Sequence, residues 1–127
     1  MATNRVIWRL VFGLLIAITI FLSLSPKSQM PSLPVSDKLG HFLTYLTLGV
    51  SGTLAARQLK RTYLLGLLAV LACLLEGLQS LVPGRSPGLA DALASSFGAA
   101  AGIFLVGLVI SRSSFLARDR KAGSTKL

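Results

Sequence analysis

Ionisable and polar side chains interrupt the apolar sequence of this chain at a few places, and their types suggest chemistry. Asp37 and His41 are four residues apart, Glu76 and Gln79 are three apart, and Asp91 follows. A histidine and carboxyl groups can exchange protons near neutral pH, so they could act in general acid–base catalysis. The same acids beside lysine or arginine could instead form ion pairs that only fix packing. Because the spacing matches no recognisable zinc motif, we expect no metal and no cofactor.

Four apolar runs must position these residues. They cover approximately residues 6–24, 39–56, 62–82 and 88–110. As helices they would be about 27 to 35 Å long, enough to cross a bilayer core of about 30 Å. Membrane β-barrels show shorter segments that alternate apolar and polar residues, which these runs do not. The sequence therefore predicts an all-α membrane protein, a bundle of four transmembrane helices in one domain over residues 1–110.

Breakers and caps define the ends of the expected helices. Three prolines between residues 26 and 34 exclude a helix between the first two runs. Ser36 can cap the second helix, with Asp37 in its first turn, and Ser86 can cap the fourth, with Pro87 as its first helical residue. Residues 111–127 are basic and lack apolar periodicity. We expect them to form a disordered cytoplasmic tail.

Composition limits the partners. Of the 127 residues, 53% are hydrophobic and 13% are charged, whereas soluble domains have about 25% charged residues. The net charge of +9 sits between apolar runs, so no polar domain is left for nucleic acid, and the expected partner is the lipid bilayer. Cys73 is the one cysteine, which excludes an internal disulfide.

The basic residues also predict the orientation. If the helices alternate, one side of the membrane holds Arg5, Arg9, Arg57, Lys60, Arg61, Arg112, Arg118, Arg120, Lys121 and Lys126, and the other holds Lys27, Lys38 and Arg85. Lysine and arginine are enriched on the cytoplasmic side of membrane proteins. We therefore expect a multi-pass protein of the plasma (cytoplasmic) membrane with both termini in the cytoplasm. A cleavable signal in the first run is the alternative, but Pro26 fits poorly beside its cleavage point.

This orientation gathers the polar residues near the extracytoplasmic surface. Helical spacing places His41 and Tyr45 on one face of the second helix, and Asp91 and Ser95 on one face of the fourth. The expected polar cluster consists of Asp37, Lys38, His41, Tyr45, Glu76, Gln79, Arg85, Asp91 and Ser95. Gly98 and Gly102 follow on the face of Asp91, and small residues at this spacing serve close helix packing. They could pack within the bundle or form a homodimer.

The order of these residues resembles the VanZ-like family of small bacterial membrane proteins. The resemblance rests on Asp37-Lys38-x-x-His41-Phe42-x-x-Tyr45, then Glu76-x-x-Gln79, then Arg85 followed by Asp91, and covers roughly residues 37–102. Ser95 departs from the pattern, because the family usually shows asparagine there. The resemblance implies a four-helix membrane protein and a link to glycopeptide resistance of the teicoplanin kind. It supplies no mechanism and no catalytic residues.

Three functions fit these observations. The first is a pocket for an anionic or polar envelope molecule, such as a lipid-linked precursor, because two helix N-termini lie there beside Lys38 and Arg85. The second is an intramembrane hydrolase or transferase on a lipid-linked envelope substrate, with His41 or Glu76 as the base. The third is a structural protein whose polar cluster only fixes helix packing.

Overall fold

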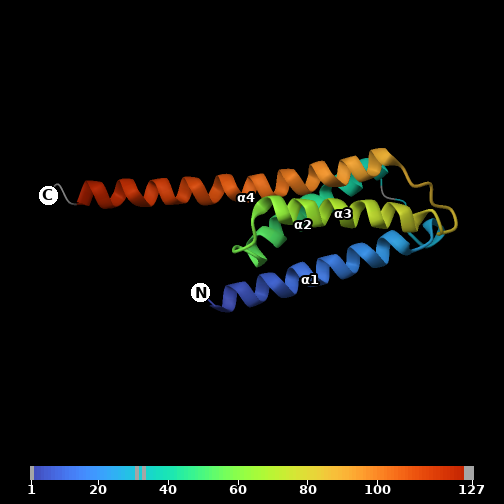
Figure 1. Ribbon diagram of the computed structural model, residues 1–127, viewed down its shortest axis with the longest axis horizontal. Coiled ribbons are helices and arrows are strands. Elements are labelled where there is room, and N and C mark those ends of the chain that lie inside the picture. Colours follow the sequence, from blue (N-terminus) through green and yellow to red (C-terminus); the bar gives the residue numbers. More distant parts are fainter. Residues whose placement is uncertain (1, 31, 33, 125–127) are drawn as a thin grey trace.

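The computed structural model describes residues 2–30, 32 and 34–124 of the chain. Its elements are α1 (Ala2–Leu24), a short 3-10 helix η1 (Lys27–Gln29), α2 (Asp37–Ala55), α3 (Arg61–Gln79) and α4 (Leu89–Ser124). Successive α-helices run in opposite directions, so α1 begins at the end of the bundle towards which α4 runs (Figure 1). The described residues contain no strand. The prediction of an all-α protein with four helices is confirmed.

Three of the four helices are long and apolar enough to cross a membrane. These spans are Asn4–Leu24, Arg61–Gln79 and Leu89–Phe115. Helix α2, with 19 residues, is long enough but less apolar than this standard requires. Asp37, Lys38 and His41 lower the apolar character of α2 below that of its neighbours. The helix that carries the largest share of the expected site is thus less apolar than α1 and α3.

Helix caps agree with the sequence for α2 and differ for α4. The side chain of Ser36 accepts a hydrogen bond from the Leu39 amide at 3.3 Å, as predicted. In α4 the first helical carbonyl belongs to Gly88, which accepts from the amides of Asp91 and Ala92. Ser86 and Pro87 therefore lie before the helix, and the predicted cap at Ser86 is wrong. The Gly88 amide is instead satisfied by a side chain from α3.

The C-terminal segment also differs from the expectation. Helix α4 continues past residue 110 to Ser124, whereas a disordered tail was predicted from residue 111. The continuation contains alanine, leucine, arginine and lysine, which favour helix, and no glycine before Gly123. A charged helix shows no apolar periodicity, so the composition of this segment did not indicate a helix. Residues 125–127 of the predicted tail lie outside the described residues.

Small residues bring α2 and α4 into direct backbone contact. A Cβ atom added to Gly98 would meet the Phe42 carbonyl oxygen, and one added to Gly102 would meet that of Leu46. Gly49 of α2 lies equally close to the Ala99 carbonyl. In the structure, Gly98 and Gly102 serve packing within the chain.

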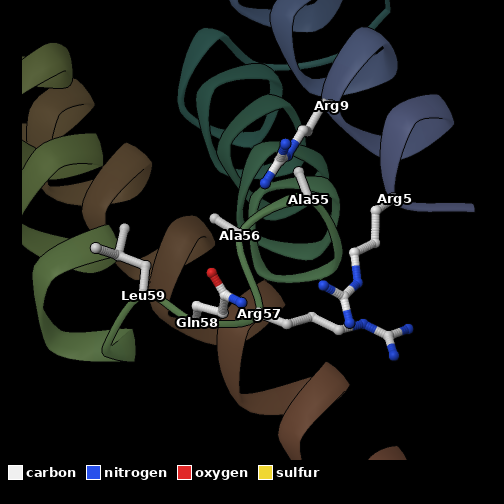
Figure 2. Close-up of a pocket in the computed structure, with 7 residues that line it drawn as sticks. All are labelled: Arg5, Arg9, Ala55, Ala56, Arg57, Gln58 and Leu59. Atoms are coloured by element: carbon white, nitrogen blue, oxygen red, sulfur yellow. The ribbon is translucent and has the colours of Figure 1, made fainter. Parts of the chain in front are cut away.

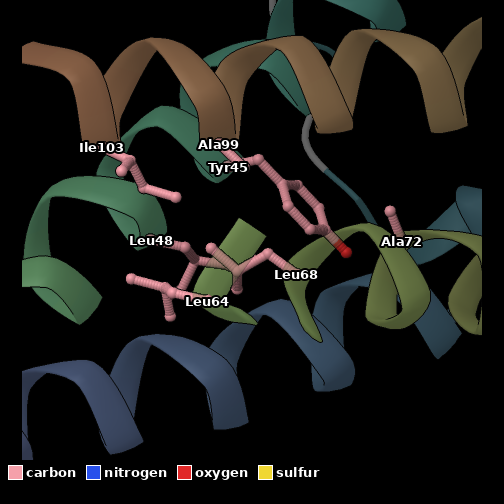
Figure 3. Close-up of a cluster of buried hydrophobic side chains, with 7 residues drawn as sticks. All are labelled: Tyr45, Leu48, Leu64, Leu68, Ala72, Ala99 and Ile103. Carbon is pink, nitrogen blue, oxygen red and sulfur yellow. The ribbon is translucent and has the colours of Figure 1, made fainter. Parts of the chain in front are cut away.

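Apolar side chains from α2, α3 and α4 form the core, and α1 closes it on the remaining side. The cluster consists of Tyr45, Leu48, Leu64, Leu68, Ala72, Ala99 and Ile103 (Figure 3). Phe12, Leu15 and Ile16 of α1 pack against it. Many large apolar side chains point outward, as Phe21 and Phe104 do, being 71% and 70% exposed. An apolar exterior around a small core is suited to lipid rather than water.

We expect Gly98→Ala to destabilise the fold, because the methyl group would push α2 away from α4. Overpacking of this kind costs about 1 to 3 kcal/mol. Gly66→Ala is the matched control, since nothing lies within 4 Å of its added Cβ and alanine favours helix. Reversible unfolding in detergent micelles measures both free energies of unfolding. Equal effects of the two substitutions would contradict the close contact between α2 and α4.

Candidate functional site

His41 and Glu76 meet inside the bundle at the end where α2 begins and α3 ends. The Nε2 atom of His41 lies 3.6 Å from Oε1 of Glu76, and the two side chains are 19% and 10% exposed. Glu76 is in the last turn of α3, which ends at Gln79. The prediction that polar residues of α2 and α3 converge is confirmed for this pair.

The second oxygen of Glu76 connects α3 to the start of α4. Oε2 accepts a hydrogen bond from the Gly88 amide at 3.1 Å. The first amides of a helix lack partners within the helix and carry partial positive charge, so a carboxylate there is stabilised. Glu76 therefore fills the anion-binding position at the N-terminus of α4 and contacts α2 with its other oxygen.

Asp91 completes a group from three helices. His41 of α2, Glu76 of α3 and Asp91 of α4 each offer a ligand atom, and these atoms all lie within 4.8 Å of one another. We call these three residues the His–carboxylate cluster. They are 35 and 15 positions apart in the sequence, so no local metal motif announces them. Only their common depth on three helices could have indicated that they might share an ion, which the sequence analysis did not expect.

Ser95 orients the histidine from the opposite side. Its hydroxyl lies 3.3 Å from Nδ1 of His41, and Ser95 is 1% exposed. The other ring nitrogen, at 3.6 Å from Glu76, is too distant for a good hydrogen bond. The imidazole is therefore fixed by Ser95 while Nε2 faces the two carboxyl groups.

Two further predicted residues are buried beside the cluster with an unsatisfied polar atom. Among the described residues, neither the Tyr45 hydroxyl nor Nε2 of Gln79 has a hydrogen-bond partner. The Tyr45 hydroxyl points towards Ala72, one turn before Glu76 on α3 (Figure 3). Buried polar groups normally have partners. These two atoms are free to hydrogen-bond to a further polar group beside the cluster.

Arg85 lies outside the cluster, contrary to the sequence analysis. Its Nε donates to the Ser25 carbonyl at 3.3 Å, and a terminal guanidinium nitrogen donates to the Leu22 carbonyl at 2.7 Å. These carbonyls are at the C-terminal end of α1, where helix carbonyls lack partners and carry partial negative charge. Arg85 is thus a cap for α1, a role that no local sequence pattern reveals.

Asp37 and Lys38 lie at the surface rather than with the buried residues. Asp37 pairs with Lys27 at 3.2 Å, and the two side chains are 72% and 61% exposed. Lys38 is also exposed. Exposed pairs contribute little to stability. Neither of the two expected cations, Lys38 or Arg85, therefore pairs with Glu76 or Asp91 in the part of the chain that the structure describes.

The opposite end of the bundle holds a cationic cavity of about 340 Å³. Its lining residues are Arg5, Arg9, Ala55, Ala56, Arg57, Gln58 and Leu59, and the three arginines reach it from α1 and the α2–α3 connection (Figure 2). The two ends of the molecule thus differ in charge, with arginines at one and the His–carboxylate cluster at the other.

A family model described as VanZ/LLP1 matches residues 4–110 of the chain. The chain belongs to the VanZ/LLP1 family. The matched region includes the whole His–carboxylate cluster, Ser95, Tyr45 and Gln79, which confirms the resemblance drawn from the sequence. No curated protein and no solved structure matches the chain.

We expect Arg85→Gln to loosen the end of α1, because the Ser25 carbonyl would lose the Arg85 donor and the Leu22 carbonyl would keep only the Ser25 amide. Hydrogen bonds to charged groups contribute about 1.5 to 3 kcal/mol, and the free energy of unfolding in detergent should fall by an amount in this range. Arg85→Lys should rescue it poorly, since one ammonium cannot reproduce the guanidinium fork. Arg112→Gln, at an exposed position of α4, is the control. A stable Arg85→Gln variant would contradict the capping role.

Proposed function

We propose that this VanZ/LLP1 protein resides in the cytoplasmic membrane with both termini in the cytoplasm and the His–carboxylate cluster near the extracytoplasmic surface. The excess of basic residues at the opposite end supports this orientation. Arg5, Arg9 and Arg57 around one cavity are part of that excess. Three helices with membrane-spanning length and hydropathy support the location.

We propose further that the cluster performs acid–base chemistry on a lipid-linked polar molecule of the cell envelope, and that this changes susceptibility to glycopeptides of the teicoplanin type. The observation that carries the proposal is the contact of His41 with Glu76 at 3.6 Å, with Asp91 alongside. The imidazole takes a proton from water as the water oxygen bonds to the substrate. The bond between the attacked atom of the substrate and the leaving oxygen breaks, and a protonated carboxyl group gives that oxygen a proton. In a transfer reaction an alcohol replaces the water.

Capture of an anion by charge alone has less support. That function relied on Arg85, on Lys38 and on free helix N-termini. Arg85 instead caps α1, and the N-terminus of α4 holds the Glu76 carboxylate. Within the cluster an anionic headgroup would face two carboxyl groups and one histidine. The arrangement favours groups that exchange protons over groups that attract an anion.

A purely structural role is the second candidate, and one observation favours it. Glu76 touches α2 through His41 and α4 through Gly88, so it joins three helices without any ligand. In that case its charge matters only for packing. Substitutions at Glu76 that keep or remove its hydrogen bonding separate the two functions.

The orientation can be tested with single cysteines at Ser28 and Ser124 in a Cys73→Ala background. Ser28 is exposed in η1, at the end that holds the cluster, and Ser124 ends α4. We expect a membrane-impermeant thiol reagent to label position 28 on intact cells and position 124 only after lysis, because the basic end should face the cytoplasm. Labelling of position 124 but not 28 on intact cells would reverse the orientation.

Glu76→Gln tests the proposed chemistry. The amide oxygen can still accept from the Gly88 amide, so the protein should stay folded, but the carboxyl group can no longer exchange a proton. We expect the Glu76→Gln protein to have no effect on glycopeptide susceptibility, even in cells that produce it in normal amounts. Glu76→Leu leaves the Gly88 amide without a partner, which costs about 1 to 3 kcal/mol. Glycopeptide-susceptibility assays and thermal unfolding in detergent measure the function and the stability of the two variants.

Asp37→Asn is the matched control, because it removes an exposed carboxyl group at the same end of the bundle. It should leave both stability and susceptibility unchanged. A folded Glu76→Gln variant with the full cellular effect would remove the carboxyl group from the mechanism. The structural role would then be the better account of the cluster.

A further inference from the structure

The His–carboxylate cluster carries more negative than positive charge. Among the described residues, the ion pairs are Lys27–Asp37 and His41–Glu76, and the Asp91 carboxyl group has no hydrogen bond from another side chain or amide there. Even a protonated His41 would balance only one of the two carboxylates. Uncompensated charge is costly between apolar helices. A cation shared by the three residues would offset this charge.

The position of the histidine indicates where that cation belongs. Ser95 holds Nδ1, which leaves Nε2 facing Glu76 at a distance beyond good hydrogen bonding. Histidine ligands of metal ions are oriented in this way, with one ring nitrogen held by a neighbouring polar group and the other free for the ion. When Ser95 accepts a hydrogen bond from Nδ1, the Nε2 lone pair points at an acidic oxygen.

The distances fit a shared metal ion. Two ligand atoms on one tetrahedral ion, each bound at about 2.0 to 2.2 Å, are about 3.4 Å apart. Nε2 of His41 and Oε1 of Glu76 are 3.6 Å apart, and the ligand atoms of all three residues lie within 4.8 Å of one another. Small side-chain rotations would bring Asp91 to the same ion. Imidazole nitrogen with carboxylate oxygen is a donor set that zinc accepts.

An independent observation comes from the buried groups that surround the cluster. Tyr45 is 2% exposed, its hydroxyl has no partner among the described residues, and it points along the bundle towards the Glu76 end of α3 (Figure 3). Gln79, 3% exposed, leaves its amide nitrogen without a partner one turn after Glu76. A water molecule on a metal ion would supply the polar group that these atoms lack.

We propose that His41, Glu76 and Asp91 bind one divalent transition-metal ion, with zinc as the best fit, and that Ser95 positions the histidine ligand. Three protein ligands leave a coordination position open to water or substrate. An ion bound to Nε2 and to both carboxylates would occupy the atoms that the acid–base step proposed above uses. It would replace that step by activating the attacking water itself, so its binding is argued from the geometry alone. It would also let an anionic headgroup approach two carboxylates, because the ion offsets their charge.

The test measures bound metal directly in the full chain. The protein is purified without an affinity tag in a Cys73→Ala background, because Cys73 is exposed and could bind zinc by itself. It is reconstituted in nanodiscs, loaded with zinc chloride, passed into metal-free buffer and analysed by mass spectrometry for elements. We expect one zinc ion per chain. X-ray absorption should show nitrogen and oxygen ligands at about 2.0 to 2.2 Å and no sulfur.

Variants identify the ligands. Asp91→Asn should lose the ion without a large change in fold, since Asp91 makes no described side-chain hydrogen bond, and His41→Gln should lose it too. Asp37→Asn should retain the ion. Ser95→Ala should weaken zinc affinity by about 10- to 100-fold. Ser96→Ala is its control, because the Ser96 hydroxyl donates to the Ala92 carbonyl in its own helix.

Two results would overturn the proposal. One is a helical, monodisperse Cys73→Ala protein that holds no metal after loading with zinc, manganese or cobalt chloride in turn. The other is an ion that remains in the Asp91→Asn and His41→Gln variants. Neither readout depends on activity, so the metal site can be disproved without disproving the acid–base function. A metal-free protein that still changes glycopeptide susceptibility would remove the ion and keep the acid–base function, and a metal-binding protein without that effect would do the reverse.

Discussion

A carboxylate inside an apolar bundle has to be satisfied by its neighbours, and Glu76 imposes this requirement on the whole outer end of the molecule. One of its oxygens accepts from the Gly88 amide and the other faces His41. The first contact requires the chain to turn back sharply after α3, so that α4 begins beside the residue that caps it. The second requires α2 to lie against the last turn of α3. The positions of three helices thus follow from one side chain.

The glycine contacts between α2 and α4 make the rest of the cluster reachable. Gly98 and Gly102 let the α4 backbone touch the carbonyls of Phe42 and Leu46. At this separation a side chain as short as Ser95 reaches His41 across the interface. The family usually shows the longer asparagine at this position. Close packing therefore explains how serine can hold the histidine here, and it links the small-residue stripe to the chemistry of the cluster.

The sequence predicted the helices and the convergence of polar residues from α2, α3 and α4, because apolar runs and equal depth in a membrane are one-dimensional properties. It did not single out the pair of His41 and Glu76. It did not predict the partner of Arg85, since an acidic side chain and a row of backbone carbonyls are equally plausible acceptors until the fold brings α1 close. Asp37 was predicted in the cluster because the sequence does not show which cation an acid will pair with. In the structure it pairs with Lys27 at the surface. The helix after residue 110 was missed because an exposed helix needs no apolar stripe.

The low hydropathy of α2 follows from its place in the bundle. It packs against each of the other three helices, whereas the membrane span of α1 is only 11% buried within the molecule. Ser51 and Thr53 of α2 are buried and donate to carbonyls of their own helix at 2.8 and 2.7 Å, so they can be tolerated without water. His41 is held by Ser95 and faces Glu76. The cluster thus lies on the side of α2 that the other helices cover, where neighbouring side chains can satisfy its polar atoms.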